Sequence, residues 1–508
     1  MCTDKDDYTE MIKPPFYPIV YVRGYAGSQS EVEDTVATPY MGFNLGSTKL
    51  RQLWDREIVK YVFESPLIRL MKDHAYSDVF NEGDLSTDRR VSARSIWIYR
   101  YYESVSKDLG SGERPPIEDY AKGLDRLIED IRDRVCGPAD SQDASEIADR
   151  EKFKVHLVAH SMGGLITRCY LQNIHPGKSS GKPPPVDKVF TYATPHGGID
   201  LRGIGNLPAF LQINNVDNFN EKRMREYLNI SSNSVNSLDG KFDSNRFFSL
   251  VGTNYRDYPA AKGLASAAVG PMSDGLVQIK NACVARTPRA FVHRSHSGHY
   301  GIVNSEEGYQ NLRRFLFGDV RVDIRLSIDD ISLPAAIEKE KAKGHQIRAS
   351  YHAETAVRVR GARWDLHRRS VADSSAHFIP YKRIKDKKPI YLYTGYLSKQ
   401  SRVRRRGPMG FTIDLGIMVP EYEVDRKWRL DHHFEGGYIF RDKINFDLST
   451  TGSSLGLKYG FDSKTPNRSS KKLKALAQDG TTEFRIPISR SSKPGISATL
   501  TIRATPWV

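Results

Sequence analysis

The residues from Val155 to Leu165 read VHLVAHSMGGL, and this stretch decides the fold. Mostly apolar residues lead directly into a histidine, a serine, a methionine and two glycines. Two interpretations are open. The serine can belong to a tight strand-to-helix turn that needs small residues, or Ser161 can be a nucleophile that the end of a strand presents to a substrate.

The length and composition indicate a globular protein of two domains. A chain of 508 residues exceeds what one hydrophobic core usually spans, and its 39% hydrophobic content suits packed domains. No apolar run approaches the roughly 18 residues of a membrane-spanning helix. The acidic N-terminal stretch MCTDKDDYTEMIKPP is unlike a secretory signal. We expect a cytoplasmic protein, or one exported without a cleavable signal, with peripheral membrane association as a further option.

The cysteines give no sign of a metal site. Cys2, Cys136, Cys169 and Cys283 have no metal-binding spacing and imply no disulfides. A reducing compartment is the simplest interpretation. The sequence predicts neither a metal nor an organic cofactor.

The net charge of +15 is concentrated in the last third of the chain. Residues 321–508 carry 36 basic and 20 acidic residues, whereas the first 320 residues are close to neutral. Such an asymmetry favours a separate domain with an anionic partner, for which a membrane surface is a better candidate than nucleic acid. A basic surface that is merely solvated is the alternative.

Residues 1–318 alternate short β-rich runs with helical periodicity. This alternation predicts an α/β fold with a mostly parallel sheet covered on both faces. The expected strands are 17–22, 95–102, 153–158, 186–192, 247–251 and 289–293, and the expected helices are 115–136, 164–174 and 305–317.

The periodicity changes to two after Gly318. In VRVDIRLSID, apolar residues from Val320 to Ile328 alternate with polar ones, which is typical of a half-buried strand. Similar alternation returns in 411–415, 484–488 and 496–502. We therefore predict that residues 319–508 form an all-β antiparallel sandwich, with 462–474 as an exposed loop.

The residues around Ser161 fit a nucleophile elbow. Ala159 and Gly163 give the pattern small-x-Ser-x-small, which lets a strand and a helix meet at a sharp turn. The pattern alone is common, but here a predicted strand precedes it and a predicted helix follows it. This context favours the nucleophile over a plain structural turn.

A serine hydroxyl needs a base and an acid that orients the base. Asp274 follows the predicted strand 247–251 and lies in the order expected of an acid, although an Asp-Gly turn without a role is the alternative. Three histidines follow the last strand. His293 is expected to end that strand, His299 is the preferred base, and His296 is the second candidate.

The oxyanion that develops during acyl transfer needs N–H donors. The first strand ends in Arg23-Gly24-Tyr25-Ala26-Gly27, whose glycines allow the backbone to approach closely. The backbone N–H groups of Tyr25 and Met162 are the predicted donors.

With these motifs in place, residues 15–318 resemble a serine lipase or esterase of the α/β-hydrolase superfamily. The elbow AHSMGG, the segment Thr194-Pro195-His196-Gly197-Gly198 and the acid loop Ser273-Asp274-Gly275 resemble those of bacterial lipases and of deacylases that act on lipid anchors. Two departures are Arg23 in place of the usual histidine before Gly24, and Ala159 in place of the commoner glycine. The resemblance implies carboxylic ester hydrolysis and a cap over the serine, for which 199–227 and 35–80 are candidates, with ordinary packing as the alternative.

Residues 319–508 resemble, in outline, the lipid-facing β-sandwich that follows the hydrolase domain in some lipases. Their densest positive charges are Arg402, Arg404, Arg405, Arg406, Lys382, Arg383, Lys385, Lys387 and Lys388. We expect hydrolysis of a lipid or phospholipid acyl ester by Ser161 with His299 and Asp274. Acyl transfer on the same residues, or an inactive scaffold that binds membranes, are the alternatives.

Overall fold

The computed structural model divides the chain into two compact units. The first unit is Met1–Arg289 with Arg294–Phe317, and the second is Ala290–His293 with Gly318–Val508. The structure describes residues 12–26, 29–52, 55–81, 84–85, 90–179, 181–199, 216–258, 269–298, 300–384, 386–425, 432–451, 454–478 and 480–507.

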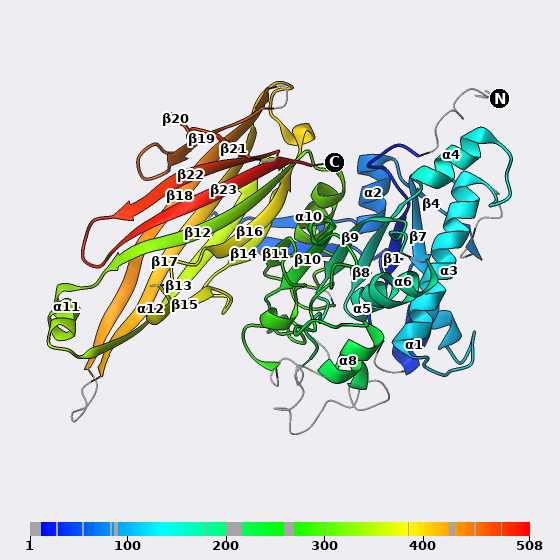
Figure 1. Ribbon diagram of the computed structural model, residues 1–508, viewed down its shortest axis with the longest axis horizontal. Coiled ribbons are helices and arrows are strands. Elements are labelled where there is room, and N and C mark those ends of the chain that lie inside the picture. The colour runs from blue at the N-terminus through cyan, green and yellow to red at the C-terminus, as the bar shows by residue number, and fades with distance from the viewer. Residues whose placement is uncertain are drawn as a thin grey trace. The chain divides into compact units, whose positions relative to one another are not determined.

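A seven-stranded sheet forms the centre of the first unit, in the order β11-β10-β9-β8-β1-β7-β4 (Figure 1), although residues 290–292 of its edge strand β11 are grouped with the second unit. Pairings of β1 with β7 and β8, of β8 with β9 and of β9 with β10 are all parallel. The predicted α/β class with a mostly parallel sheet is confirmed. Its strands are β1 Ile19–Val22, β4 Ser77–Asp78, β7 Ser95–Tyr99, β8 Val155–His160, β9 Val186–Tyr192, β10 Phe247–Gly252 and β11 Arg289–Val292.

Helices of the first unit follow the strands, as the alternating pattern predicted. Their bounds are α1 Gln29–Val36, α2 Pro66–His74, α3 Ile117–Cys136, α4 Ala144–Lys152, α5 Met162–Cys169, α6 His175–Lys178, α8 Glu221–Tyr227 and α10 Glu306–Phe317. Two short hairpins lie outside the main sheet: β2 Ser47–Gln52 with β3 Ile58–Phe63, and β5 Phe80–Asn81 with β6 Asp84–Leu85.

Helices α3 and α10 cover opposite faces of the sheet. On α10, the ring of Phe315 lies 6.0 Å from Phe190 and 5.4 Å from Phe248. On α3, the carbonyl of Tyr120 accepts a hydrogen bond from the hydroxyl of Tyr99 on β7. In the strand register, Tyr99 pairs with Val22, Val22 with Ala159, and Ala159 with Thr191, so these residues share one face of the sheet. Because Phe190 and Thr191 are consecutive in β9, they face opposite sides. Helices on both faces explain why the strands are apolar throughout.

The second unit consists of two antiparallel sheets, which confirms the predicted sandwich class. One sheet has the order β16-β12-β23-β22-β21, and the other has the order β14-β13-β17-β18-β19-β20 with β15 paired to β13. Strand β18 contacts β22 and β23 of the opposite sheet. The strands are β12 Val320–Ser332, β13 Gln346–Val359, β14 His367–Arg369, β15 His377–Pro380, β16 Ile390–Leu397, β17 Met409–Asp425, β18 His432–Thr451, β19 Ser454–Phe461, β20 Lys471–Lys472, β21 Leu476–Gln478, β22 Thr481–Arg490 and β23 Gly495–Pro506, and the helices are α11 Ala335–Ala342 and α12 Tyr381–Ile384.

The alternation in the sequence sets which side of each sheet is buried. In β12, Val320, Val322, Ile324 and Leu326 are buried, whereas the residues between them are partly or fully exposed. The facing sheet contributes Phe411 and Phe446, whose rings stack at 4.8 Å. Burial of these apolar rows between the two sheets stabilises the unit by the hydrophobic effect. Over the described part of the chain, no helix is both long and apolar enough to cross a membrane.

A lysine lies fully buried in the first unit. The ammonium of Lys188 on β9 donates a hydrogen bond of 2.7 Å to the carbonyl of Leu316, and its neighbour Asp187 is bound by Arg246. Burial lowers the pKa of Lys188 to about 7, although the charge of Asp187 opposes this shift.

This burial predicts a pH-dependent contribution to stability. Below about pH 7 the lysine is charged in both states, so folding carries the full cost of burying the charge. Between the folded pKa and the unfolded value of 10.5, only the unfolded state keeps the proton, so stability rises with pH. The free energy of unfolding of the wild type should therefore increase relative to Lys188→Met from about pH 7 to about pH 9 in urea titrations. A difference that stays constant over this range would contradict the assignment.

Candidate active site

Ser161 lies at a sharp turn between β8 and α5. Its backbone has φ 52° and ψ −125°, a conformation that is costly for a residue with a side chain. The Ser161 N–H donates to the carbonyl of Tyr192 at 2.9 Å, and the Ser161 carbonyl accepts from the N–H of Gly164 at 3.0 Å. These backbone bonds hold the strained residue in place.

Glycines surround the turn because neighbouring atoms leave no room for a side chain. A Cβ on Gly24 would lie 2.6 Å from Cβ of Ser161, and one on Gly163 would lie 2.3 Å from the carbonyl oxygen of Val22. A Cβ on Gly164 would lie 2.2 Å from Oγ1 of Thr194. The small residues noted in the sequence are thus required by close packing on several sides of Ser161.

A histidine and an aspartate lie in line with the serine. Nε2 of His296 is 2.9 Å from Oγ of Ser161, and Nδ1 of His296 is 2.9 Å from Oδ2 of Asp274. Ser161, His296 and Asp274 are 5%, 3% and 1% exposed. Because a carboxylate can only accept, Nδ1 carries the proton and Nε2 is left to accept the serine proton.

Asp274 is fixed by the backbone of its own loop. Oδ1 accepts hydrogen bonds from the N–H groups of Leu276 at 3.0 Å and Val277 at 2.7 Å, so that Oδ2 faces His296. The carbonyl of Asp274 also accepts from the His296 N–H at 2.9 Å. The turn at Asp274 and Gly275 therefore itself holds the carboxylate that faces His296.

The structure describes one of the two candidate bases. The imidazole beside Ser161 belongs to His296, the second candidate, whereas the preferred His299 lies outside the described residues. His293 follows β11 and is exposed, and its Nδ1 lies 3.6 Å from Oδ1 of Asp373. The backbone bond between His296 and Asp274 and the bridge between Ser295 and Gly301 set which residue of the loop faces the serine. Such long-range pairing has no signature in the local sequence.

The loop after β1 is held beside Ser161 by tyrosines. The hydroxyl of Tyr102 donates to the carbonyl of Gly24 at 2.9 Å and accepts from the N–H of Ala26 at 2.5 Å. Burial raises the pKa of Tyr102 to about 12, so the phenol keeps its proton. Tyr25 follows Gly24, and the guanidinium of Arg114 lies 5.0 Å from the Tyr25 ring. On the other side of Ser161, Met162 is the first residue of α5, where backbone N–H groups have no partner within the helix.

Two further rings surround His296. Nε2 of His160 donates to the His296 carbonyl at 2.9 Å, and Tyr258 meets the His296 ring edge-on at 5.6 Å. Burial lowers the pKa of His160 to about 3, helped by the nearby His296, so His160 is neutral. Neither residue was singled out in the sequence, although His160 directly precedes the serine.

The segment Thr194–Gly198 behind the turn is tied down by a buried arginine. Arg168 donates to the carbonyl of His196 at 3.0 Å, and also to the carbonyls of Val235 at 2.9 Å and Ser237 at 2.8 Å. His196 in turn pairs with Oγ1 of Thr191 at 3.0 Å. The segment therefore supports the turn structurally.

The candidate cap segments are only partly described. Residues 200–215 of the first candidate lie outside the described residues. The described part of this candidate ends with α8, on which Tyr227 is buried. In the second candidate, Ile58 and Val62 on β3 are both 67% exposed. Within the described ranges, no group of three or more His, Cys, Asp and Glu side chains is placed to hold a metal ion.

No protein-family model and no curated protein matches the chain. Among solved structures, the chain is similar to phospholipase PlaB from Legionella pneumophila in complex with thio-NAD, at 13% identity and a TM-score of 0.34, over 82% of this chain and 89% of that chain. A second structure of phospholipase PlaB from Legionella pneumophila is similar at 12% identity and a TM-score of 0.31, over 82% of this chain and 90% of that one. These values describe a remote likeness.

The packing around the turn predicts a contrast between two helical glycines. Gly164→Ala should lower the free energy of unfolding by about 1 to 3 kcal/mol, because its Cβ overlaps the buried Thr194. Gly177→Ala in α6 is the control, since no atom lies within 4 Å of its Cβ position and alanine favours helix by about 1 kcal/mol. Urea titrations of both variants test the contrast, and equal stability of the two would refute it.

Proposed function

We propose that the protein is a serine hydrolase that cleaves carboxylic esters through an acyl-enzyme intermediate. The observation that carries this proposal is the hydrogen-bonded line from Asp274 through His296 to Ser161, with 2.9 Å at each step. A base within hydrogen-bond reach of a serine, itself oriented by a carboxylate, is the arrangement that activates a hydroxyl.

The reaction takes place in two halves. Oγ of Ser161 attacks the ester carbonyl while Nε2 of His296 takes the hydroxyl proton, and the collapsing tetrahedral intermediate expels the alcohol, which receives that proton. Water then attacks the acyl-enzyme with His296 as base again, and the acid leaves from a restored Ser161. Asp274 keeps its negative charge throughout and stabilises the imidazolium.

The backbone N–H groups of Tyr25 and Met162 are the proposed oxyanion donors. Tyr25 follows Gly24, and Met162 follows Ser161. A Cβ added to Gly24 would overlap the Cβ of Ser161, so both backbones lie close to the reacting serine oxygen. Tyr101, Tyr102 and Arg114 fix the loop that carries Tyr25, which keeps the donor in place before the reaction.

A lipid or phospholipid acyl ester is the proposed substrate class. The excess positive charge of residues 321–508 supports an anionic lipid surface as the place of action. Acyl transfer would use the same residues with an alcohol in place of water. If the protein is instead an inactive scaffold that binds membranes, Ser161 does not react with an ester or a serine-directed probe.

A fluorophosphonate probe tests the nucleophile and the base together. Ser161→Ala should abolish labelling, and His296→Ala should reduce both labelling and ester hydrolysis by about 10³-fold or more, because the hydroxyl loses its base. His299→Ala is the matched control and should retain most activity.

The outcomes separate the alternatives. Labelling that survives Ser161→Ala would contradict the assignment of Ser161 as the nucleophile. If His299→Ala loses activity and His296→Ala retains it, the base is His299. An unlabelled wild type would favour the inactive scaffold.

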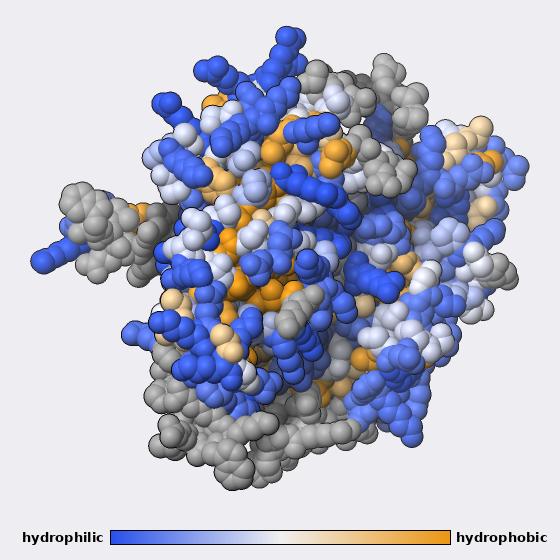
Figure 2. Space-filling model, turned by 60° about the vertical axis from the view of Figure 1, so that its left-hand side comes forward, coloured by the Kyte–Doolittle hydropathy of each residue, from blue (hydrophilic) through white to orange (hydrophobic). Residues whose placement is uncertain are grey.

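We further propose that the second unit recruits the protein to anionic membranes. In the turn from Arg402 to Arg406, Arg404, Arg405 and Arg406 are exposed and Val403 is 72% exposed. Figure 2 shows hydrophilic side chains projecting over much of one face, with apolar residues exposed among them. Basic side chains contribute about 1 kcal/mol each near an anionic surface, and an exposed apolar residue can enter the headgroup layer.

Vesicle flotation of the full chain tests this recruitment. Binding to phosphatidylcholine vesicles with about 30% phosphatidylserine should exceed binding to phosphatidylcholine alone and weaken from about 50 to about 200 mM salt. Changing Arg404, Arg405 and Arg406 together to Gln should reduce the binding at low salt. Equal binding to neutral and anionic vesicles would count against the proposal.

A further inference from the structure

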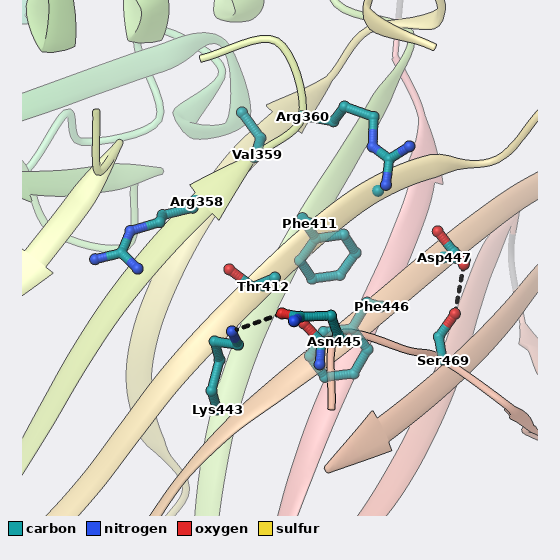
Figure 3. Close-up of a pocket in the computed structure, with 12 residues that line it drawn as sticks. Arg358, Val359, Arg360, Phe411, Thr412, Lys443, Asn445, Phe446, Asp447 and Ser469 are labelled. Carbon is teal, nitrogen blue, oxygen red and sulfur yellow. Dashed lines mark hydrogen bonds between the residues drawn. The ribbon is translucent and has the colours of Figure 1, made fainter. Parts of the chain in front are cut away.

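A polar cavity of about 320 Å³ lies on the second unit, far along the chain from Ser161 (Figure 3). Its floor is the outward face of β13, β17 and β18, and residues Asn467 and Ser469 of the segment before β20 also line it. A volume of this size matches the lower range of small-ligand sites.

Strand register places the polar side chains of the floor in rows. Arg358, Thr412 and Asn445 lie opposite one another across β13, β17 and β18. On one side of this row, the backbone N–H of Arg360 donates to the carbonyl of Gly410 on β17. Gly410 in turn lies opposite Asp447 on β18. On the other side, Lys443 is opposite Asp414. Thr412 and Asn445 thus lie between two cations, Arg360 and Lys443, as Figure 3 shows.

Gly410 leaves the space that Arg360 uses. A Cβ at Gly410 would lie 3.0 Å from Nε and 3.3 Å from Nη2 of Arg360, so the guanidinium lies across the bare glycine. Arg358 also lines the cavity, but it is bound by Asp365, and in Figure 3 its side chain extends away from Thr412 and Asn445.

The wall of the cavity is fixed to the floor by hydrogen bonds. Lys443 donates to Oδ1 of Asn467 at 3.2 Å, and Asn445 donates to Oδ1 of Asp462 at 3.1 Å. The Asn467 N–H donates to the same Asp462 oxygen at 2.7 Å, and Ser469 donates to Asp447. The cavity is therefore formed before any ligand arrives.

The charges around the cavity favour an anion. Arg358, Arg360 and Lys443 are the cations among the lining residues, and Asp447, whose Oδ2 accepts from Ser469, is the carboxylate. Lys443 also lies 3.5 Å from Oδ2 of Asp462, next to the cavity. In the next pairing beyond Asp447, Lys458 lies opposite Lys472, and both are exposed.

We propose that this cavity binds a phosphate group, which lies over Thr412 and Asn445 between Arg360 and Lys443. A guanidinium presents paired donors that match phosphate oxygens, an ammonium adds a point charge, and the threonine hydroxyl and asparagine amide supply further donors. The group can belong to a phospholipid headgroup or be free in solution. The basic turn of Arg402 to Arg406 precedes β17 at the same end of the sheet as Gly410, which favours the headgroup.

The test uses the full chain and two probes. Inorganic phosphate is titrated calorimetrically, and vesicles of phosphatidylcholine with about 20% phosphatidic acid are used in flotation. The double variant Arg360→Gln, Lys443→Gln should weaken phosphate binding by about tenfold or more, because both charge-assisted contacts are lost. Lys339→Gln is the matched control: this exposed cation lies on α11, which precedes the opposite end of β13.

Each outcome decides the proposal. Loss of phosphate binding together with weaker binding to the acidic vesicles supports the site with a headgroup as its ligand, and loss of phosphate binding alone supports it with free phosphate. A wild type that binds no phosphate at millimolar concentration, or a double variant that binds phosphate like Lys339→Gln, overturns it.

Two controls keep the test interpretable. Thr412→Val removes one donor at nearly constant volume and should also weaken phosphate binding, so it replaces the double variant if that fails to fold. Hydrolysis of a soluble short-chain ester should be unchanged in all these variants, because the site is independent of the chemistry at Ser161. Failure of the phosphate site and failure of the proposed hydrolase are thus distinguishable.

Discussion

The strained turn at Ser161 is the constraint on which the first unit depends. A residue with φ 52° and ψ −125° persists only where its surroundings leave it no alternative. Here Gly24, Gly163 and Gly164 allow the loop after β1, the end of β1 and Thr194 to close around it, and the Tyr192 carbonyl holds its N–H. The same packing directs the serine hydroxyl towards His296, so the stability of the turn and the proposed chemistry share one cause.

Orientation of the imidazole comes from the backbone as much as from side chains. Asp274 holds His296 twice, through its carboxylate at Nδ1 and through its carbonyl at the backbone N–H. His160, neutral because it is buried, holds the His296 carbonyl from the other side. With three fixed contacts, the ring has little freedom other than to present Nε2 to Ser161. The phosphate cavity of the second unit follows the same principle, since hydrogen bonds within the chain form the site in advance.

Local sequence was sufficient for some of these features and insufficient for others. The parallel strands, the turn at Ser161 and the position of Asp274 could be predicted, because apolar runs, small residues and an Asp-Gly turn leave signatures within a few residues. The proposed choice of His296 over His299 could not, because it depends on a backbone bond to Asp274, 22 residues away in the chain. The long strand β18 was missed because Gly436 and Gly437 interrupt its alternation, and β13 was missed although its buried residues alternate from Tyr351 to Val359. The cavity beside Arg360 depends on register across three strands, which no single segment reveals.

The most direct test of the central claim is the proton spectrum of the imidazole that bonds Asp274. A proton held between Nδ1 and a carboxylate resonates far downfield of the amide region. The account predicts such a resonance in the wild type and in His299→Ala, and its loss in both His296→Ala and Asp274→Asn. A resonance that persists in His296→Ala and disappears in His299→Ala would contradict it.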